Sequence, residues 1–133
     1  MMFSARRAAC ALLFSALLCA CAASIQVAPA QLAPLAGATP DLLVTSDVPV
    51  KLATGYTRTI PADSRWRAVG TLPQGTVFRP VDTVFAIEGR NVHEAYLVVR
   101  SDTLHGFYLP GEGNFSALSP SLSLPSATTG VQR

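Results

Sequence analysis

The sequence has few charged residues, and they are unevenly placed. Only 14% of its 133 residues are charged, and no acidic residue precedes Asp41. Two of the ten basic residues, Arg6 and Arg7, lie in the first seven positions, so the rest of the chain has eight side chains of each sign. Nucleic-acid-binding domains concentrate basic residues on one surface. The neutral body therefore argues against nucleic acid as a partner.

Cysteine is absent after Cys21, and histidine is scarce. The two earlier cysteines are Cys10 and Cys19, so the body of the protein has no intradomain disulfide and no thiolate metal site. If Ser101-Asp102 forms a two-residue turn, Val98 faces His105, and His93 lies five positions farther along its strand, roughly 16 Å away. That separation is too long for shared coordination. We expect no metal site and no cofactor.

Residue patterns typical of catalysis are also missing. His93 and Glu94 are neighbours on an expected strand, so they point to opposite faces and one does not orient the other. The sequence has no Gly-x-Ser-x-Gly elbow, no phosphate-binding glycine loop, and no cysteine and histidine pair beyond Cys21. The sequence predicts no enzyme and no small-molecule substrate.

The amino-terminal segment is typical of a secretory signal peptide. Residues 1–7 are positively charged, and residues 8–20 form an apolar run interrupted only by Ser15. Thirteen residues are too few to span a bilayer as a mature helix, but they suit the core of a signal peptide. We predict that residues 1–20 are a helical signal peptide, removed during export.

The motif that follows resembles the lipobox of bacterial lipoproteins. In Leu18-Cys19-Ala20-Cys21, the small Ala20 precedes the lipid-acceptor position, Cys21, and Leu18 is the aliphatic position. The motif departs from the family at Cys19, where a small residue is usual. The resemblance implies that Cys21 carries the lipid, palmitate included, as the mature amino terminus. Ala22 in place of aspartate then implies an outer-membrane anchor facing the periplasm. The alternative is an ordinary signal peptide cut after a nearby alanine, which leaves a soluble protein.

Both ends of the mature chain have compositions typical of unstructured segments. Residues 21–40 are rich in Ala and Pro and carry no charge, which predicts a disordered tether, up to roughly 60 Å long if extended as polyproline. Residues 119–133 are rich in Ser, Pro, Thr and Leu, which predicts a disordered tail. The folded domain is expected at residues 41–118.

Within that domain the hydrophobic pattern has a period of two. Residues 65–69, 76–81, 83–87, 92–100 and 104–109 are predicted strands, with residues 42–45 and 56–60 as further candidates. Turn sequences separate them at Pro73-Gln74-Gly75, Gly89-Arg90-Asn91, Ser101-Asp102 and Pro110-Gly111-Glu112-Gly113. No segment offers the helix that a parallel crossover needs. The sequence predicts a small all-β domain, either an antiparallel meander or a partly closed barrel.

One part of the domain resembles bacterial SH3-like modules. The residues concerned are Val69-Gly70-Thr71-Leu72-Pro73-Gln74-Gly75-Thr76-Val77, followed by Tyr96-Leu97-Val98-Val99 and Gly106-Phe107-Tyr108. They match a strand, a diverging turn and a strand, then an aromatic strand and a glycine-aromatic pair. The amino-terminal element of the family is absent, and residues 83–94 are an insertion. The resemblance implies a non-catalytic domain that binds cell-wall or protein ligands.

The candidate ligand contacts are surface residues near turns. Trp66 with its flanking Arg65 and Arg67, and the glycine-rich loop carrying Glu112, Asn114 and Phe115, are plausible binding anchors. A core position is the alternative for Trp66. The remaining core is expected from Phe78, Phe85, Ile87, Tyr96, Val98 and Phe107. Two functions follow as hypotheses: a lipoprotein that binds peptidoglycan or a peptide, or a structural subunit of an envelope assembly such as a secretion or conjugation apparatus.

Overall fold

The computed structural model describes residues 23–128, and every regular element in this range is a β-strand, which confirms the predicted all-β class. The predicted signal peptide and Cys21 lie outside the described residues. Within them, no helix is long and apolar enough to cross a membrane. The strands are β1 (Ala28–Pro29), β2 (Leu42–Val44), β3 (Val48–Lys51), β4 (Thr57–Ile60), β5 (Arg65–Leu72), β6 (Gly75–Pro80), β7 (Ala86–Glu88), β8 (Val92–Glu94), β9 (Tyr96–Arg100), β10 (Thr103–Leu109), β11 (Asn114–Ser123) and β12 (Ser126–Thr128).

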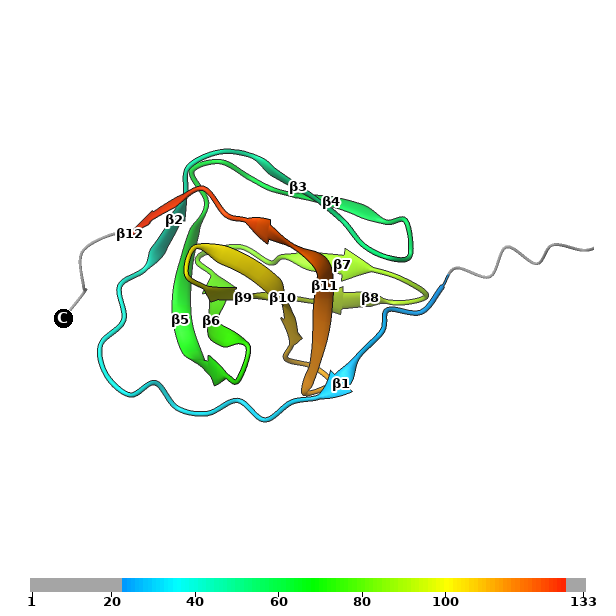
Figure 1. The fold of residues 1–133 in the computed structure, drawn as a ribbon, viewed down its shortest axis with the longest axis horizontal. Helices are drawn as coiled ribbons and strands as arrows, with labels where there is room; N and C mark the ends of the chain where they lie inside the picture. The colour runs from blue at the N-terminus through cyan, green and yellow to red at the C-terminus, as the bar shows by residue number, and fades with distance from the viewer. Residues whose placement is uncertain (1–22, 129–133) are drawn as a thin grey trace, which may run out of the picture.

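Eight strands form one curled antiparallel sheet, in the order β1-β11-β10-β9-β6-β5-β2-β12 (Figure 1). Strands β5, β6, β9, β10 and β11 follow one another across it as a meander, and the β7–β8 hairpin is inserted between β6 and β9. A second hairpin, β3–β4, links β2 to β5. The edge strands β1 and β12 do not pair with each other, so the sheet is open and is not closed into a barrel.

The core lies inside the curl of the sheet and beneath the two hairpins. Trp66 packs edge-on against Phe85, with ring centroids 5.3 Å apart, and Phe85 stacks with Phe107 at 6.2 Å. Of the predicted core residues, Phe78, Phe85, Ile87, Val98 and Phe107 are buried, and Tyr96 is half-buried. Strand β9 is buried on both faces, because successive side chains point to opposite sides of a strand. Leu97 and Val99 pack in the main core, whereas Val98 packs in a second cluster with Leu72, Val77 and Phe115.

The turn between β9 and β10 has the predicted two residues, but the predicted register beyond it is wrong. Ser101 and Asp102 both have positive φ, at 50° and 56°, as a tight hairpin turn with right-handed strand twist requires. Leu104 then pairs with Val99, whereas Gly106 pairs with Val98. His105 is the extra residue of a β-bulge, so it does not face Val98 as expected. A bulge inserts one unpaired residue and shifts every later pair.

The predicted disordered tether is replaced by a segment fixed to the sheet. In this N-terminal segment, residues 23–40, β1 pairs with β11, and Ala33 exchanges two backbone hydrogen bonds of 2.9 Å with Thr71. Proline and alanine do not prevent this arrangement, because an edge segment needs only some of its amides for pairing. The composition was compatible with an extended linker, but an extended chain can equally lie along a sheet.

The predicted disordered tail is likewise corrected for the residues that the structure includes. Strand β11 extends to Ser123, and the chain then turns through Leu124 and Pro125 into β12, which pairs with β2. Leu124 is almost completely buried, at 1% exposure, and its amide donates to the Asp102 carbonyl at 2.8 Å. Leu118, Leu122 and Leu124 occupy alternate positions, and burial of these side chains stabilises a segment that is otherwise rich in serine.

Candidate functional site

A surface pocket lies at the bases of the two hairpins. It has a volume of about 400 Å³ and is lined by Arg58 of β4, by the corner between β4 and β5, and by the loop between β6 and β7. We call it the Arg58 pocket. Its lining residues are Leu43, Arg58, Pro61, Asp63, Ser64, Arg65, Trp66, Pro80, Val81, Asp82, Thr83, Val84 and Phe85. This volume is within the range of small-molecule and peptide side-chain sites.

Arg58 is held against the aromatic part of this pocket. Its guanidinium carbon lies 4.9 Å from the centroid of the Phe85 ring, a cation–π arrangement. Its Nε atom is buried and has no hydrogen-bond partner among residues 23–128. A buried donor without an acceptor costs free energy. Arg58 therefore brings a positive charge to the wall of the pocket, while its Nε is buried without an acceptor among these residues.

The β4–β5 corner beside Arg58 is fixed by a chain of hydrogen bonds. The Asp63 amide donates to the Val44 carbonyl at 2.7 Å, and the Ser64 hydroxyl donates to the Pro61 carbonyl at 2.6 Å. Trp66 Nε1 then donates to Ser64 Oγ at 2.9 Å. These three hydrogen bonds fix the backbone and the Trp66 ring of the corner, so this wall of the pocket is preorganised.

The charges around the pocket are of both signs. Arg58 and Arg65 contribute two guanidinium groups, and Asp63 and Asp82 contribute two carboxylates. Both aspartates have positive φ, at 64° and 61°, a conformation that Asp tolerates better than most residues. Val84 beside them is 68% exposed. The pocket thus offers a polar, zwitterionic rim next to an apolar surface.

The structure separates the predicted Trp66 cluster into three roles. Trp66 belongs to the core, with only 1% of its surface exposed, which corrects its assignment as a ligand contact. Arg65 is exposed at the edge of the Arg58 pocket. Arg67 pairs instead with the buried Asp41, with Nη2 3.3 Å from Oδ2. The two arginines that flank Trp66 therefore do not act together.

The three predicted contacts of the glycine-rich loop lie away from the Arg58 pocket. The Glu112 carboxylate accepts a 2.8 Å hydrogen bond from Nδ1 of His93, and this bond connects the loop to β8. Phe115 is buried in a small second core cluster, and Asn114 pairs with Leu109 and Pro29 across β11. These three residues therefore make contacts that stabilise the fold, and none of them lines the Arg58 pocket.

Sequence reasoning missed Arg58, Asp63, Asp82 and Val84 as site residues. Arg58 stands between Thr57 and Thr59 in a predicted strand, a pattern that equally describes a solvent-facing arginine. The pocket depends on two loops that are distant in sequence and meet only through the sheet. No local motif distinguishes such a site.

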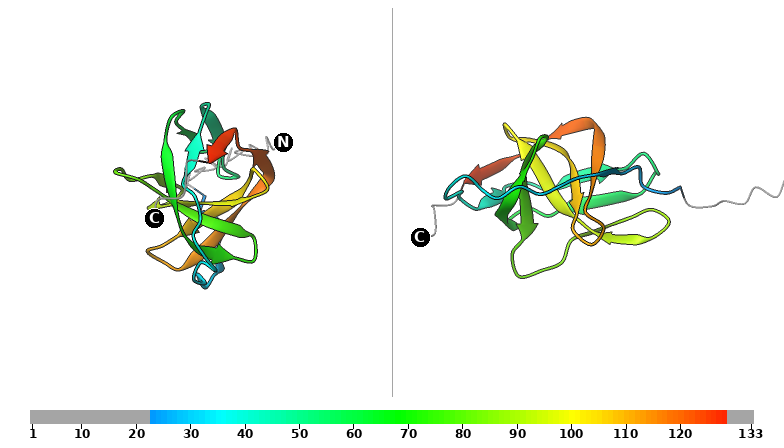
Figure 2. Two further views of the ribbon diagram at one scale, coloured as in Figure 1. Left: turned by 90° about the vertical axis from the view of Figure 1, so that its left-hand side faces the viewer. Right: turned by 90° about the horizontal axis from the view of Figure 1, so that it is seen from below.

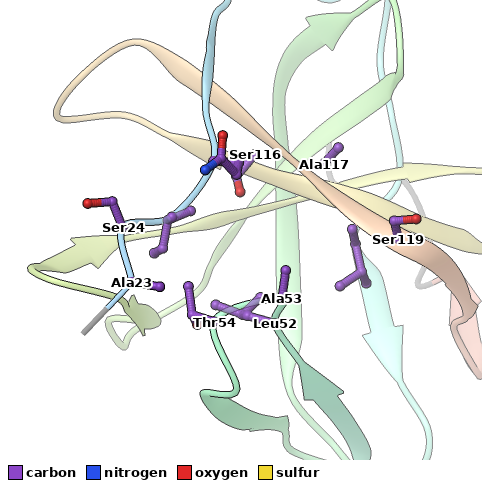
Figure 3. Close-up of a pocket in the computed structure, with 11 residues that line it drawn as sticks. Ala23, Ser24, Leu52, Ala53, Thr54, Ser116, Ala117 and Ser119 are labelled. Carbon is purple, nitrogen blue, oxygen red and sulfur yellow. The ribbon is translucent and has the colours of Figure 1, made fainter. Parts of the chain in front are cut away.

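A second pocket lies at the turn of the β3–β4 hairpin. It has a volume of about 180 Å³ and is formed by residues 23–26, by residues 52–54 and by residues 116–119 of β11. Figure 3 shows Ala23 and Ser24 on one side of it and Leu52, Ala53 and Thr54 on another. Its walls are mostly small side chains, and no lining residue is charged. It therefore offers space but little chemistry.

Two further observations concern polar side chains outside these pockets. Within residues 23–128, no group of three or more His, Cys, Asp or Glu side chains is placed to hold a metal ion.

Burial raises the pKa of the Tyr96 hydroxyl above its usual value of 10.0, and the nearby Glu94 carboxylate raises it further. A tyrosine with a raised pKa stays neutral at physiological pH.

No protein-family model, no curated protein and no solved structure matches this chain.

Proposed function

We propose that this protein is a membrane-anchored periplasmic lipoprotein whose β domain binds a cell-wall or peptide ligand without catalysing a reaction. The anchor part of the proposal is supported by the lipobox-like Leu18-Cys19-Ala20-Cys21 and the preceding apolar run. Acyl chains contribute about 0.8 kcal/mol for each buried methylene, so multiple chains give stable attachment.

The binding part is carried by Arg58. Its guanidinium lines a pocket of about 400 Å³, and its buried Nε lacks an acceptor among the described residues. The guanidinium group as a whole offers several N–H donors, and arginine forms strong charge-assisted hydrogen bonds with carboxylates.

The mixed charges of the pocket specify the ligand further. Arg58 and Arg65 suit carboxylates, whereas Asp63 and Asp82 suit an ammonium group. The exposed Val84 offers contact for an aliphatic side chain. A short peptide that carries both charges, such as the stem peptide of peptidoglycan, has this combination of groups.

Cell fractionation tests the anchor. We expect wild-type protein to sediment with membranes and to incorporate labelled palmitate, and Cys21→Ala to appear in the soluble periplasmic fraction without label. A Cys19→Ala variant is the matched control, because it removes a thiol from the motif and leaves the acceptor. The anchor proposal is wrong if Cys21→Ala still sediments with membranes.

Retention on isolated sacculi tests the ligand. The full-length lipoprotein in detergent should be retained, and Arg58→Met should weaken retention about tenfold or more, since a charged hydrogen bond contributes roughly 1.5–3 kcal/mol. Arg79→Met is the control, because Arg79 is exposed on β6 and does not line the pocket. Equal retention of wild type and Arg58→Met would contradict the assignment of this pocket. Absence of retention for all variants, together with one defined crosslinked complex in cells, would favour a structural subunit of an envelope assembly.

A further inference from the structure

The N-terminal segment enters the domain at a fixed place between two hairpin turns. A Cβ atom on Gly89, in the β7–β8 turn, would lie 2.7 Å from Ile25 Cγ1 and 3.0 Å from the Ala23 carbonyl oxygen. On its other side the segment faces residues 52–54 of the β3–β4 turn across the small pocket. Figures 1 and 2 show the start of the segment and both hairpin turns at one end of the molecule, with β12 at the other.

From this place the segment cannot swing away from the domain. It is held farther along by β1 pairing with β11, by the Ala30 amide donating to the Gly113 carbonyl at 2.9 Å, and by the two bonds between Ala33 and Thr71. The covalent path from the lipid-acceptor position to the folded body therefore ends at Ala23.

That path is very short. Only Ala22 separates Cys21 from Ala23. Because an extended chain spans at most about 3.6 Å per residue, the two Cα atoms lie no more than roughly 7 Å apart. A tether of roughly 60 Å would have left the domain free of the membrane surface; a path of this length does not.

We propose that the end of the domain formed by residues 23–27 and the turns at residues 52–56 and 88–91 lies against the lipid headgroups. We call it the anchor-side surface. The inference rests on the proposed acylation of Cys21, and the occupant of this surface is the bilayer that holds those acyl chains. The domain consequently has one orientation, with β12 directed away from the membrane.

The side chains of the anchor-side surface suit an interface with lipid. Two of the three exposed large apolar residues of the described region, Val27 and Val92, lie in or next to it, with 46% and 65% exposure. Lys51 and Arg90 are exposed beside the same turns, with one exposed carboxylate, Glu88, among them. Each basic residue near an anionic surface contributes about 1 kcal/mol, so the two cations outweigh the single carboxylate. These contacts supplement the covalent anchor and favour the same orientation.

Fluorescence quenching by headgroup-labelled lipid tests the orientation. Because Cys21 is the only cysteine from that position onward and would be acylated, a new cysteine at Ala53, Arg90 or Ala127 can be labelled alone with a fluorophore. All three residues are exposed. The lipoprotein is reconstituted into vesicles of phosphatidylethanolamine and phosphatidylglycerol that contain a nitroxide-headgroup lipid. We expect at least twofold stronger quenching at positions 53 and 90 than at position 127.

A second variant separates orientation from mere attachment. Insertion of twenty Gly and Ser residues between Ala22 and Ala23 gives a flexible path of about 25 Å, and we expect quenching at positions 53 and 90 to fall toward that at position 127. Equal quenching at all three positions in protein that floats with the vesicles would overturn the orientation and leave the anchor intact. Protein that carries no lipid and does not float would overturn both.

Discussion

Gly70 lies directly beneath the backbone of Ala33. A Cβ atom on Gly70 would be 2.6 Å from the Ala33 carbonyl oxygen and 2.6 Å from Leu32 Cγ. The close approach allows Thr71, the next residue of β5, to exchange its two hydrogen bonds with Ala33. The absence of a side chain at position 70 is therefore what lets the N-terminal segment lie on the sheet.

Gly70→Ala should displace the N-terminal segment. Because the clash involves backbone, we expect a loss of about 1–3 kcal/mol in the free energy of unfolding and faster proteolysis within residues 23–40. Gly37→Ala is the matched control: nothing lies within 4 Å of its added Cβ, so its stability should stay constant or rise by up to about 1 kcal/mol. Urea unfolding and limited proteolysis measure both effects. A Gly70→Ala midpoint equal to wild type would contradict the packing described.

Leu124→Ala should destabilise the domain although the residue lies in the region predicted to be disordered. Loss of a fully buried leucine side chain costs roughly 2–5 kcal/mol, and Leu124 is 1% exposed. Leu122→Ala, at a half-buried position, should cost less. Thermal and urea unfolding give both values. If a chain ending at Leu118 unfolded at the same urea concentration as one ending at Thr128, β12 would have no structural role.

Arg65 and Arg67 should separate binding from stability. Arg67→Met removes one partner of buried Asp41, and we expect a loss of about 1 kcal/mol, because the arginine itself remains partly exposed. Arg65→Met should leave the unfolding free energy within about 0.5 kcal/mol of wild type and weaken retention on sacculi. Urea unfolding and retention on sacculi are measured for both variants. A loss of stability in Arg65→Met but not in Arg67→Met would contradict the roles given to the two arginines.

Tyr96 should make the domain less stable at alkaline pH. Its pKa in the folded state is raised above the value of 10.0 expected in the unfolded chain, by burial and then by Glu94. The unfolded chain therefore loses this proton first, so stability is fully present below pH 10.0 and falls as pH rises through the folded-state pKa. Tyr96→Phe should show a smaller fall, measured as urea midpoints at pH 8 and above pH 10.

Spectrophotometric titration of the tyrosines provides an independent check on Tyr96. Glu94→Gln removes the second cause of the shift, so the pKa of Tyr96 should move down toward its usual value while burial keeps it raised. An unchanged titration curve in Glu94→Gln would show that the carboxylate does not act on this hydroxyl.

Four of the five meander strands were predictable because their residues carry local signals, whereas β11 was not predicted. Alternating apolar side chains marked β5, β6, β9 and β10, and the turn residues Ser101-Asp102 fixed the position of a hairpin. The split of the predicted strand 92–100 into β8 and β9 was not predictable, because the apolar Ala95 at the break fits a strand equally well.

The two chain ends were mispredicted for one physical reason. Their strands gain stability from contacts distant in the sequence: Ala33 with Thr71 and Ser126 with Val44. Composition reports how well a segment folds by itself, and tertiary contacts override it. Leu122 and Leu124 are two residues apart, and Leu118 lies on the same side of the pattern, but the exposed Pro120 interrupts the alternation between them.

The candidate site was only partly predictable, because it too depends on contacts between residues distant in the sequence. The sequence identified Arg65 as a candidate because it adjoins Trp66. Arg58 could be recognised as a site residue only from the structure, in which the β6–β7 loop places the Phe85 ring centroid 4.9 Å from the Arg58 guanidinium carbon. The sequence around Arg58 and the sequence around Phe85 contain no local pattern that predicts this contact. The residues that the sequence grouped around Trp66 proved to serve the core, the pocket and an ion pair separately.

The pairing of β12 with β2 also sets the order in which this domain can be completed. The two strands come from opposite ends of the domain, Ser126 against Val44. Because a polypeptide is synthesised from its amino end, β2 is complete before β12 has been made. Long-range strand pairing is slow because loop closure must precede it. The pairing of β12 with β2 therefore forms only after the residues up to Thr128 are present, and until then one edge of β2 lacks its neighbouring strand.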